Sequence, residues 1–327
     1  VYVSVGISDK FLDSSRTSVE LVGRKNGKVD LTKSVGTQSG TYSLSVPDDV
    51  KYDDYYTLSV KAYDLAGNYS EETMSFSVNR HGSYYTQGSG EKGNKDIVVN
   101  KAESVVLRES NVDEIDTDKV KIVVYRNSTK IEVPKDKISI SYKGIIDGLH
   151  TYEYTIDKDV FGDDGKYIIQ IFSSTVNDSE NSSLSEEYSF MLDTSSPDII
   201  ISGVEDNGSY KEYSREVILD IRDQSGLSSL LVYVNGNELP KDKLSYDDVN
   251  GLYSFEMIED SSYQNIKVVA TDNAENTSEV TVGNILITAN TFVYIINQTW
   301  VKIMLIALAG VIFVGAIAVV IIKGKKK

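Results

Sequence analysis

A strand pattern that recurs along the chain constrains its fold more than any other feature. Residues 55–70 read YYTLSVKAYDLAGNYS, and residues 263–278 read YQNIKVVATDNAENTS. In both runs apolar side chains alternate with polar ones, which is the pattern of a β-strand with one buried face. A weaker copy, YIIQIFS at residues 167–173, lies between them. The chain is therefore expected to repeat one β-rich unit.

Each strong copy of the pattern ends in a predicted turn. Asp64 and Asn68 can hydrogen-bond the local backbone, and Gly67 permits a positive φ. The corresponding residues of the last copy are Asp272 and Asn276. Glu275 stands there in place of the glycine, so Asn276 should supply the left-handed conformation, or else the turn differs.

Two further pieces recur around these strands. Alternating strands led by tyrosine precede them, at residues 42–46, 152–156 and 253–257. Asn26-Gly27, Asn235-Gly236 and residues 126–128 are hairpin signals. At a spacing of roughly 100 residues this order is typical of a β-sandwich. The tyrosines that start the repeated strands, Tyr55, Tyr167 and Tyr263, are predicted to bond back to the preceding loop.

Composition agrees with a folded, all-β protein. The chain has 22 Tyr against 8 Phe, and Tyr, Val, Ile and Thr suit a pleated surface. It contains no Cys, so disulfides and cysteine metal sites are excluded. Its net charge of −16 repels phosphate backbones, so a nucleic-acid partner is not expected.

The start of the last unit carries a family resemblance. Residues 193–199 read DTSSPDI and residues 201–210 read ISGVEDNGSY, which resembles the start of a bacterial immunoglobulin-like repeat. The DLAGN turn at residues 64–68 resembles the end of such a repeat. These repeats occur in large surface proteins of Gram-positive bacteria. The resemblance implies a structural or adhesive role and supplies no catalytic residues.

The C-terminal part of the chain contains a long apolar run. Residues 303–322 read IMLIALAGVIFVGAIAVVII, and twenty helical residues span about 30 Å, the thickness of a bilayer's hydrocarbon core. Trp300 suits the outer interface, and Lys302 is the one lysine near the upstream end. The downstream lysines are Lys323, Lys325, Lys326 and Lys327. The positive-inside rule therefore predicts a single-pass helix held in the lipid of the cell membrane, with the C-terminus cytoplasmic and the N-terminal region extracellular.

The expected fold class is all-β, with tandem immunoglobulin-like β-sandwich domains followed by a single C-terminal transmembrane α-helix. The first domain, without its opening strand, should span residues 1–79. A divergent second domain should span 80–193, and a third 194–288. The predicted remainder is a juxtamembrane spacer (289–298), the transmembrane helix (299–323) and a short basic cytoplasmic tail (324–327).

Acidic pairs in the loops are the one hint of a metal site. Asp53 and Asp54, and likewise Asp163 and Asp164, could supply oxygen ligands to calcium, although solvated turn residues have the same composition. His81 and His150 each lie in a loop-like context and are expected to be surface residues. No enzymatic activity and no other cofactor is expected.

The predicted function is that of an extracellular stalk, which displays an N-terminal functional region away from the cell surface. One alternative is an adhesin whose modules bind a host or cell-wall ligand, either protein or glycan. Another is the support region of a surface enzyme whose catalytic domain lies upstream.

Overall fold

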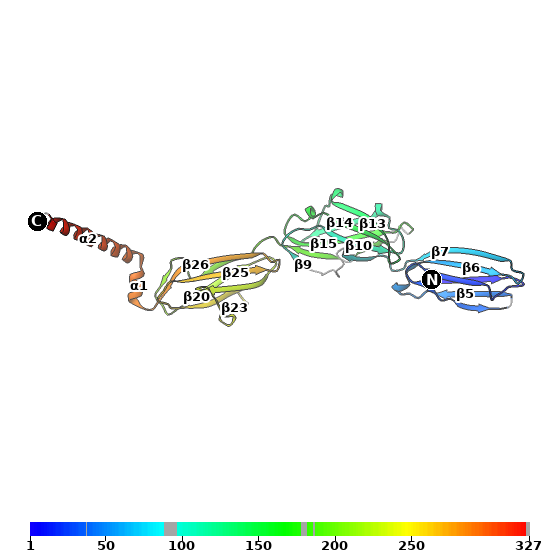
Figure 1. Ribbon diagram of the computed structural model, residues 1–327, viewed down its shortest axis with the longest axis horizontal. Coiled ribbons are helices and arrows are strands. Elements are labelled where there is room, and N and C mark those ends of the chain that lie inside the picture. Colours follow the sequence, from blue (N-terminus) through cyan, green and yellow to red (C-terminus); the bar gives the residue numbers. More distant parts are fainter. Residues whose placement is uncertain (37, 88–96, 178–181, 186, 325–327) are drawn as a thin grey trace. The chain divides into compact units, whose positions relative to one another are not determined.

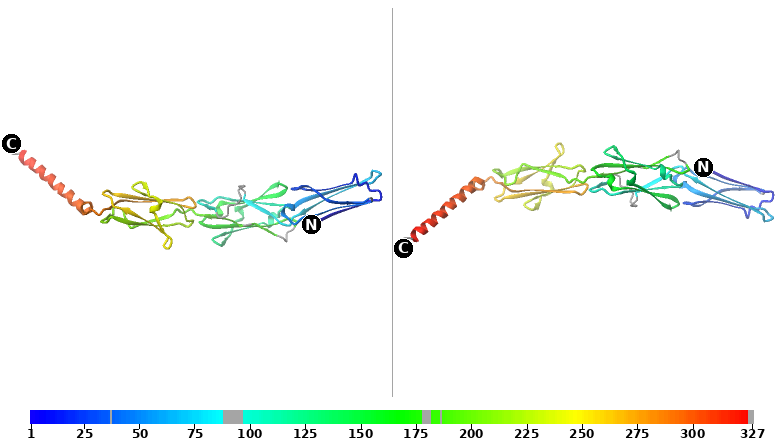
Figure 2. Two further views of the ribbon diagram at one scale, coloured as in Figure 1. Left: turned by 90° about the horizontal axis from the view of Figure 1, so that it is seen from below. Right: turned by 90° about the horizontal axis from the view of Figure 1, so that it is seen from above.

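The computed structural model of the chain describes residues 1–36, 38–87, 97–177, 182–185 and 187–324, with helical side chains as far as Val314. Contacts divide the chain into two compact units. One comprises Val1–Ile97 and Lys101–Leu192, and the other comprises Val98–Asn100 and Asp193–Lys327. Both are mostly β-sheet, and the described residues form three β-sandwiches (Figures 1 and 2).

The first β-sandwich pairs a sheet of order β1-β5-β4 with a sheet of order β3-β2-β6-β7. Its elements are β1 (Tyr2–Ser8), β2 (Ser18–Gly23), β3 (Gly27–Val29), β4 (Thr32–Val35), β5 (Ser39–Ser45), η1 (Val50–Tyr52), β6 (Asp54–Tyr63) and β7 (Tyr69–Val78). Val3 of one sheet packs in the same core as Leu21 and Leu58 of the other. One hydrophobic core therefore joins the two sheets.

The second β-sandwich pairs the order β13-β14-β10-β8 with the order β12-β11-β15-β17-β9, and β16 also pairs with β15. Its elements are β8 (Tyr84–Gln87), β9 (Ile97–Val99), β10 (Val105–Asn111), η2 (Thr117–Lys119), β11 (Lys121–Arg126), β12 (Thr129–Ile131), η3 (Lys135–Lys137), β13 (Ile138–Ile146), β14 (Leu149–Ile156), η4 (Lys158–Val160), β15 (Gly165–Ser174), β16 (Ser182–Leu184) and β17 (Tyr188–Leu192). The rings of Tyr167 and Phe190 stack with centroids 5.2 Å apart, and Phe161 packs edge-on against both. All three side chains are buried, so this aromatic cluster belongs to its core.

The third β-sandwich pairs the order β18-β20-β24-β23 with the order β19-β26-β25-β21-β22. Its elements are β18 (Asp198–Ser202), β19 (Ser209–Tyr210), β20 (Ser214–Arg222), β21 (Leu227–Val234), β22 (Asn237–Glu238), η5 (Lys241–Lys243), β23 (Ser245–Asp247), β24 (Leu252–Ile258), β25 (Gln264–Asp272) and β26 (Thr277–Ile287). Val217, Leu219 and Ile221 alternate along β20 and point into the core, which also holds Ile266 of the opposite sheet. The alternation read from the sequence is thus the alternation that buries this face.

The strand order is that of an immunoglobulin-like sandwich. In the third sandwich one sheet corresponds to strands A-B-E-D, and the other carries G-F-C with one further edge strand on each side. The second sandwich has the same two orders, and β1 of the first corresponds to strand B. The predicted all-β class with tandem immunoglobulin-like sandwiches is confirmed, as are the three predicted hairpins, β2–β3, β11–β12 and β21–β22.

The tyrosine prediction is confirmed at one of its three positions. The Tyr167 hydroxyl donates to the carbonyl oxygen of Asp163 at 2.7 Å. In the first sandwich the neighbour of the predicted residue does this instead: Tyr56, not Tyr55, donates to the carbonyl of Tyr52 at 2.9 Å. In the third sandwich the equivalent position is Gln264, whose Nε2 donates to a backbone carbonyl, that of Ile258, at 2.9 Å. The prediction was one residue out because the inward face begins one residue later.

The C-terminal part consists of α1 (Thr291–Asn297) and α2 (Thr299–Gly324). Within the described residues, no single helix satisfies the length and apolarity needed to cross a membrane. Thr291–Asn297 and Thr299–Val314 satisfy them together, although they are bent by 70° where they meet. The predicted helix is therefore present, and its position in a membrane remains a prediction.

Candidate functional site

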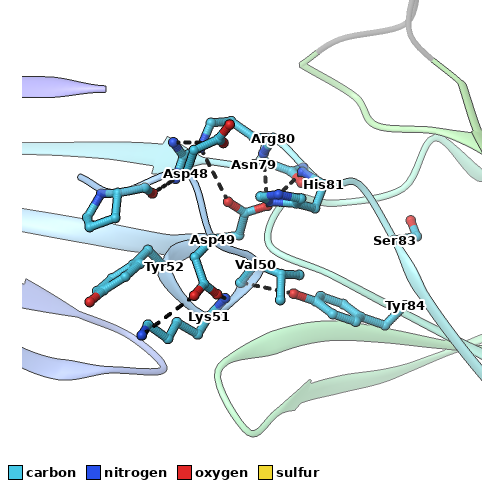
Figure 3. Close-up of polar contacts among 12 residues, drawn as sticks. Asp48, Asp49, Val50, Lys51, Tyr52, Asn79, Arg80, His81, Ser83 and Tyr84 are labelled. Atoms are coloured by element: carbon cyan, nitrogen blue, oxygen red, sulfur yellow. Dashed lines mark hydrogen bonds and ion pairs between the residues drawn. The ribbon is translucent and has the colours of Figure 1, made fainter. Parts of the chain in front are cut away.

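A polar joint connects the first and second β-sandwiches inside their common unit, and fully buried Asp53 is at its centre. Its Oδ2 accepts hydrogen bonds from the backbone N–H groups of Arg80 at 2.9 Å and His81 at 2.7 Å. The His81 Nδ1 lies 3.0 Å from the same oxygen. Arg80 also forms an ion pair with Asp48 at 3.2 Å (Figure 3). The carboxylate thus holds the segment that leads into the second sandwich.

Two more side chains, those of Tyr84 and Asn79, close this side of the joint. The Tyr84 hydroxyl, at the start of β8, donates to the carbonyl of Val50 at 3.1 Å (Figure 3). Asn79, the first residue after β7, donates through Nδ2 to Asn111 Oδ1 at 2.8 Å and to Asp113 Oδ2 at 3.0 Å. The connecting segment is therefore bonded to both sandwiches.

Arg24 makes the second half of the joint by reaching from the first sandwich into the second. Its Nε donates to the carbonyl of Gly148 at 2.7 Å, and its Nη2 donates to that of Val112 at 2.5 Å. Its Nη1 lies 3.1 Å from His150 Nε2, while the Tyr142 hydroxyl lies 2.9 Å from His150 Nδ1. Burial, and next the nearby Arg24 cation, lower the pKa of His150 because both disfavour its protonated form.

The two histidines were expected to be surface residues, which is confirmed for His81 and wrong for His150. His81 is exposed, although its backbone N–H donates to Asp53, whereas His150 is buried within the joint. Arg24 was not singled out from the sequence at all. Its partner His150 is 126 residues away in the chain, so no local pattern signals the contact.

The predicted calcium pairs have other partners in the structure. The Asp54 carboxylate is fully buried and accepts from the backbone N–H groups of Lys25, Asn26 and Tyr55, which fixes the β2–β3 hairpin. Asp163 is exposed and forms an ion pair with Arg126. Asp164 follows it in the loop before β15 and also has an interaction partner. Asp54 therefore caps a hairpin, and Asp163 balances the charge of Arg126.

The predicted turn residues form the same arrangement twice. Asn68 donates to Asp64 from its backbone N–H at 2.8 Å and from Nδ2 at 2.7 Å, and Gly67 has φ of 94°. Asn276 donates to Asp272 in the same two ways, both at 2.8 Å. Glu275 itself has the positive φ, 69°, so Asn276 does not supply the left-handed conformation.

A cluster of carboxylates that the sequence did not indicate lies at one end of the third sandwich. Asp193, Asp223 and Asp272 each place a carboxylate oxygen within 4.8 Å of the other two. Asp193 and Asp272 are fully buried, and Asp223 is half-buried. Among the described residues this is the one group of three or more acids or histidines close enough to share an ion.

Trp300, Lys302 and the four C-terminal lysines were predicted to anchor the helix in the membrane. Trp300 is 61% exposed in α2. Lys302 donates to the Tyr263 hydroxyl at 2.5 Å, and this hydroxyl also bonds Asn297 at 3.0 Å. Tyr263 thus joins the helical segment to the third sandwich instead of forming a corner. Lys323 lies in the last turn of α2, while Lys325, Lys326 and Lys327 lie outside the described residues.

Comparison with known proteins yields distant structural likenesses. No family model and no curated protein matches the sequence. Fibronectin(III)-like modules of Clostridium thermocellum CbhA are 14% identical, with 63% of this chain and 94% of that one covered and a TM-score of 0.28. Domains A168 to A170 of titin are 8% identical, with 87% and 93% covered and a TM-score of 0.38. Immunoglobulin domains 1–4 of Sidekick-1 are 11% identical, with 87% and 71% covered and a TM-score of 0.34. Because these scores are below 0.5, we assign the fold from strand order and shared cores.

Proposed function

We propose that this chain is a non-catalytic, membrane-anchored extracellular stalk that holds an N-terminal functional region away from the cell surface. The joint between the first two sandwiches is the observation that carries the proposal. Five residues, 79–83, separate β7 from β8. Asp53 binds the backbone of two of them, and Arg24 bridges the sandwiches independently. A flexible linker would leave such groups to water, so this connection suits a spacer.

The apolar helix supports the anchoring part of the proposal. Ile303 is 62% exposed and Ile306 is 72% exposed, and neighbouring apolar side chains are exposed as well. A continuous apolar surface of this kind is unfavourable in water and favourable in lipid. The lysines at the C-terminal end favour a cytoplasmic tail. Membrane lipid is thus the proposed partner, and the bacterial surface setting rests on the sequence resemblance.

The test uses the full chain in a supported lipid bilayer. The chain has no cysteine, so a Ser34→Cys variant carries one fluorophore on an exposed strand of the first sandwich. The longest strands of the first two sandwiches have 10 residues, or about 33 Å at roughly 3.3 Å each. We expect bilayer-dependent quenching to place the fluorophore of most molecules several tens of ångströms above the lipid.

Two results would contradict the stalk. If the chain washes off the bilayer, the helix is not an anchor. If the height distribution is broad and reaches the lipid, the modules do not act as a spacer. Saturable binding of a glycan or protein ligand by the bilayer-bound chain would favour the adhesin instead. As a control, deletion of residues 299–327 should release the labelled chain from the bilayer.

A further inference from the structure

We propose that Asp193, Asp223 and Asp272 bind one calcium ion at the end of the third β-sandwich. The three residues come from different parts of the chain: the segment before β18, the loop after β20 and the end of β25. Their oxygens lie within 4.8 Å of one another. Oxygens around calcium sit about 2.3–2.6 Å from the ion, so opposite ligands are up to about 5 Å apart. The cluster therefore has the dimensions of a calcium site.

A second observation points to a ligand in this cluster. Asp193 is fully buried, and its Oδ2 has no hydrogen-bond partner, whereas its Oδ1 accepts from the backbone N–H of Ser195 at 3.2 Å. A buried carboxylate oxygen without a donor is strongly unfavourable unless a cation compensates it. Arg222, adjacent to Asp223 in sequence, binds Asp220 instead, with nitrogen–oxygen distances of 2.9 and 3.0 Å.

Hydrogen bonds hold two of the carboxylates in place around the proposed ion. Asn276 Nδ2 donates to Asp272 Oδ2 and to the backbone carbonyls of Asp193 and Ser195, at 2.8–2.9 Å. Asp223 Oδ1 accepts from the backbone N–H and the hydroxyl of Ser225 at 2.8 and 2.9 Å. Asp272 Oδ2 retains a lone pair for a metal, and Asp223 can offer its other oxygen, Oδ2. The donors orient the carboxylates as outer-shell groups do.

The second sandwich provides an internal comparison. Counting along the equivalent strands gives the same three positions there: Asn79 directly after β7, Asp113 after β10 and Thr175 after β15. Only one of these three residues, Asp113, carries a carboxylate. The Asn79 amide, which stands at the position of Asp193, donates to Asp113 at 3.0 Å. Asp193 instead contributes a further negative charge. The second sandwich thus satisfies its acid with an amide, and the third requires a cation.

Calcium bound here would connect the segment before β18 to two loops of the same sandwich. Asp193 and Asp272 are 79 residues apart in the chain, so the unfolded polypeptide does not hold them together. The ion would therefore bind the folded state and not the unfolded one. Binding to the folded state alone raises thermal stability by mass action. Dissociation constants of extracellular calcium modules are about 10⁻⁴–10⁻³ M, which suits a site of three carboxylates.

The experiment is calorimetric titration of the full chain in detergent, stripped with chelator, with CaCl₂ and separately with MgCl₂. We expect one saturable calcium site and a rise of several degrees in the melting temperature at 10 mM calcium. Asp223→Asn and Asp193→Asn should each weaken binding at least tenfold. Asp113→Asn, at the matching position of the second sandwich, is the control and should leave calcium binding unchanged.

Melting in chelator distinguishes a loss of calcium binding from a loss of folding in the Asp193→Asn variant. Asp193→Asn copies the natural Asn79 arrangement, so without calcium this variant should melt no lower than the wild type. A wild type that shows neither heat of binding nor a melting shift at 10 mM calcium would overturn the site. Equal calcium binding by Asp223→Asn would overturn the residue assignment, and tighter binding of magnesium would overturn the choice of ion.

Discussion

Replacing Arg24 by alanine should uncouple the first two β-sandwiches. The side chain is partly buried, donates to two carbonyl oxygens at 2.7 and 2.5 Å, and lies 3.1 Å from His150. A hydrogen bond from a charged donor contributes about 1.5–3 kcal/mol, and bonds that share one guanidinium are not additive. We therefore expect a loss of about 2–4 kcal/mol of coupling between the sandwiches, without a loss of either core.

The assay measures distances between spin labels on Ser34→Cys and Lys130→Cys, two exposed positions in the first and second sandwiches. In the parent chain the distance distribution should be narrow, and in the Arg24→Ala variant it should be broad. The Arg24→Lys variant should lie between them, because an ammonium group keeps the charge and loses the planar fork. Thermal unfolding of the first unit should separate into two transitions in the alanine variant.

Arg16→Ala is the matched control. Arg16 also belongs to the first sandwich and makes an ion pair with Asp13 at 2.7 Å and a bond to the Asp64 carbonyl, all within that sandwich. This variant should keep the narrow distribution. If Arg24→Ala also stays narrow while both sandwiches remain folded, the joint does not depend on Arg24, and the reasoning about the polar bridge is refuted.

Further outcomes follow from single side chains. Tyr167→Phe removes the corner hydroxyl and should lower the free energy of unfolding in urea by about 1 kcal/mol; Tyr263→Phe, at an exposed hydroxyl, should cost less, and an equal cost would contradict the corner assignment. Ile266→Ala empties a fully buried position and should cost about 2–5 kcal/mol by the same measurement, with a cost below 1 kcal/mol showing that the site is not tightly packed. The pKa of His150 is lowered in the folded chain, so the unfolded chain binds more protons as the pH falls below about 6.5. The stability that neutral His150 contributes should therefore be complete above that pH and decline below it. If a His150→Gln variant shows the same change in the free energy of unfolding between pH 7.5 and 5.5, other groups cause the decline.

The sequence by itself determined the class of fold and the succession of strands, hairpins and turns along the chain. Period-two alternation, Asn-Gly hairpins and the Asp64–Asn68 turn are local signals, because they depend on residues a few positions apart. The predicted corner tyrosine of the first sandwich was Tyr55, and the structure has its neighbour Tyr56 in that role. Which one faces inward depends on the register with β2 and β7, and that is a property of the folded sheet.

Only the tertiary structure decided which polar residues act together. Arg24 and His150, like Asp193 and Asp272, look like ordinary loop residues in the sequence, since solvated turns favour the same types. They meet because the sandwich topology brings the ends of strands distant in sequence to the same end of the fold. Burial then turns a common acid or base into a specific contact, because a charge removed from water needs a defined partner.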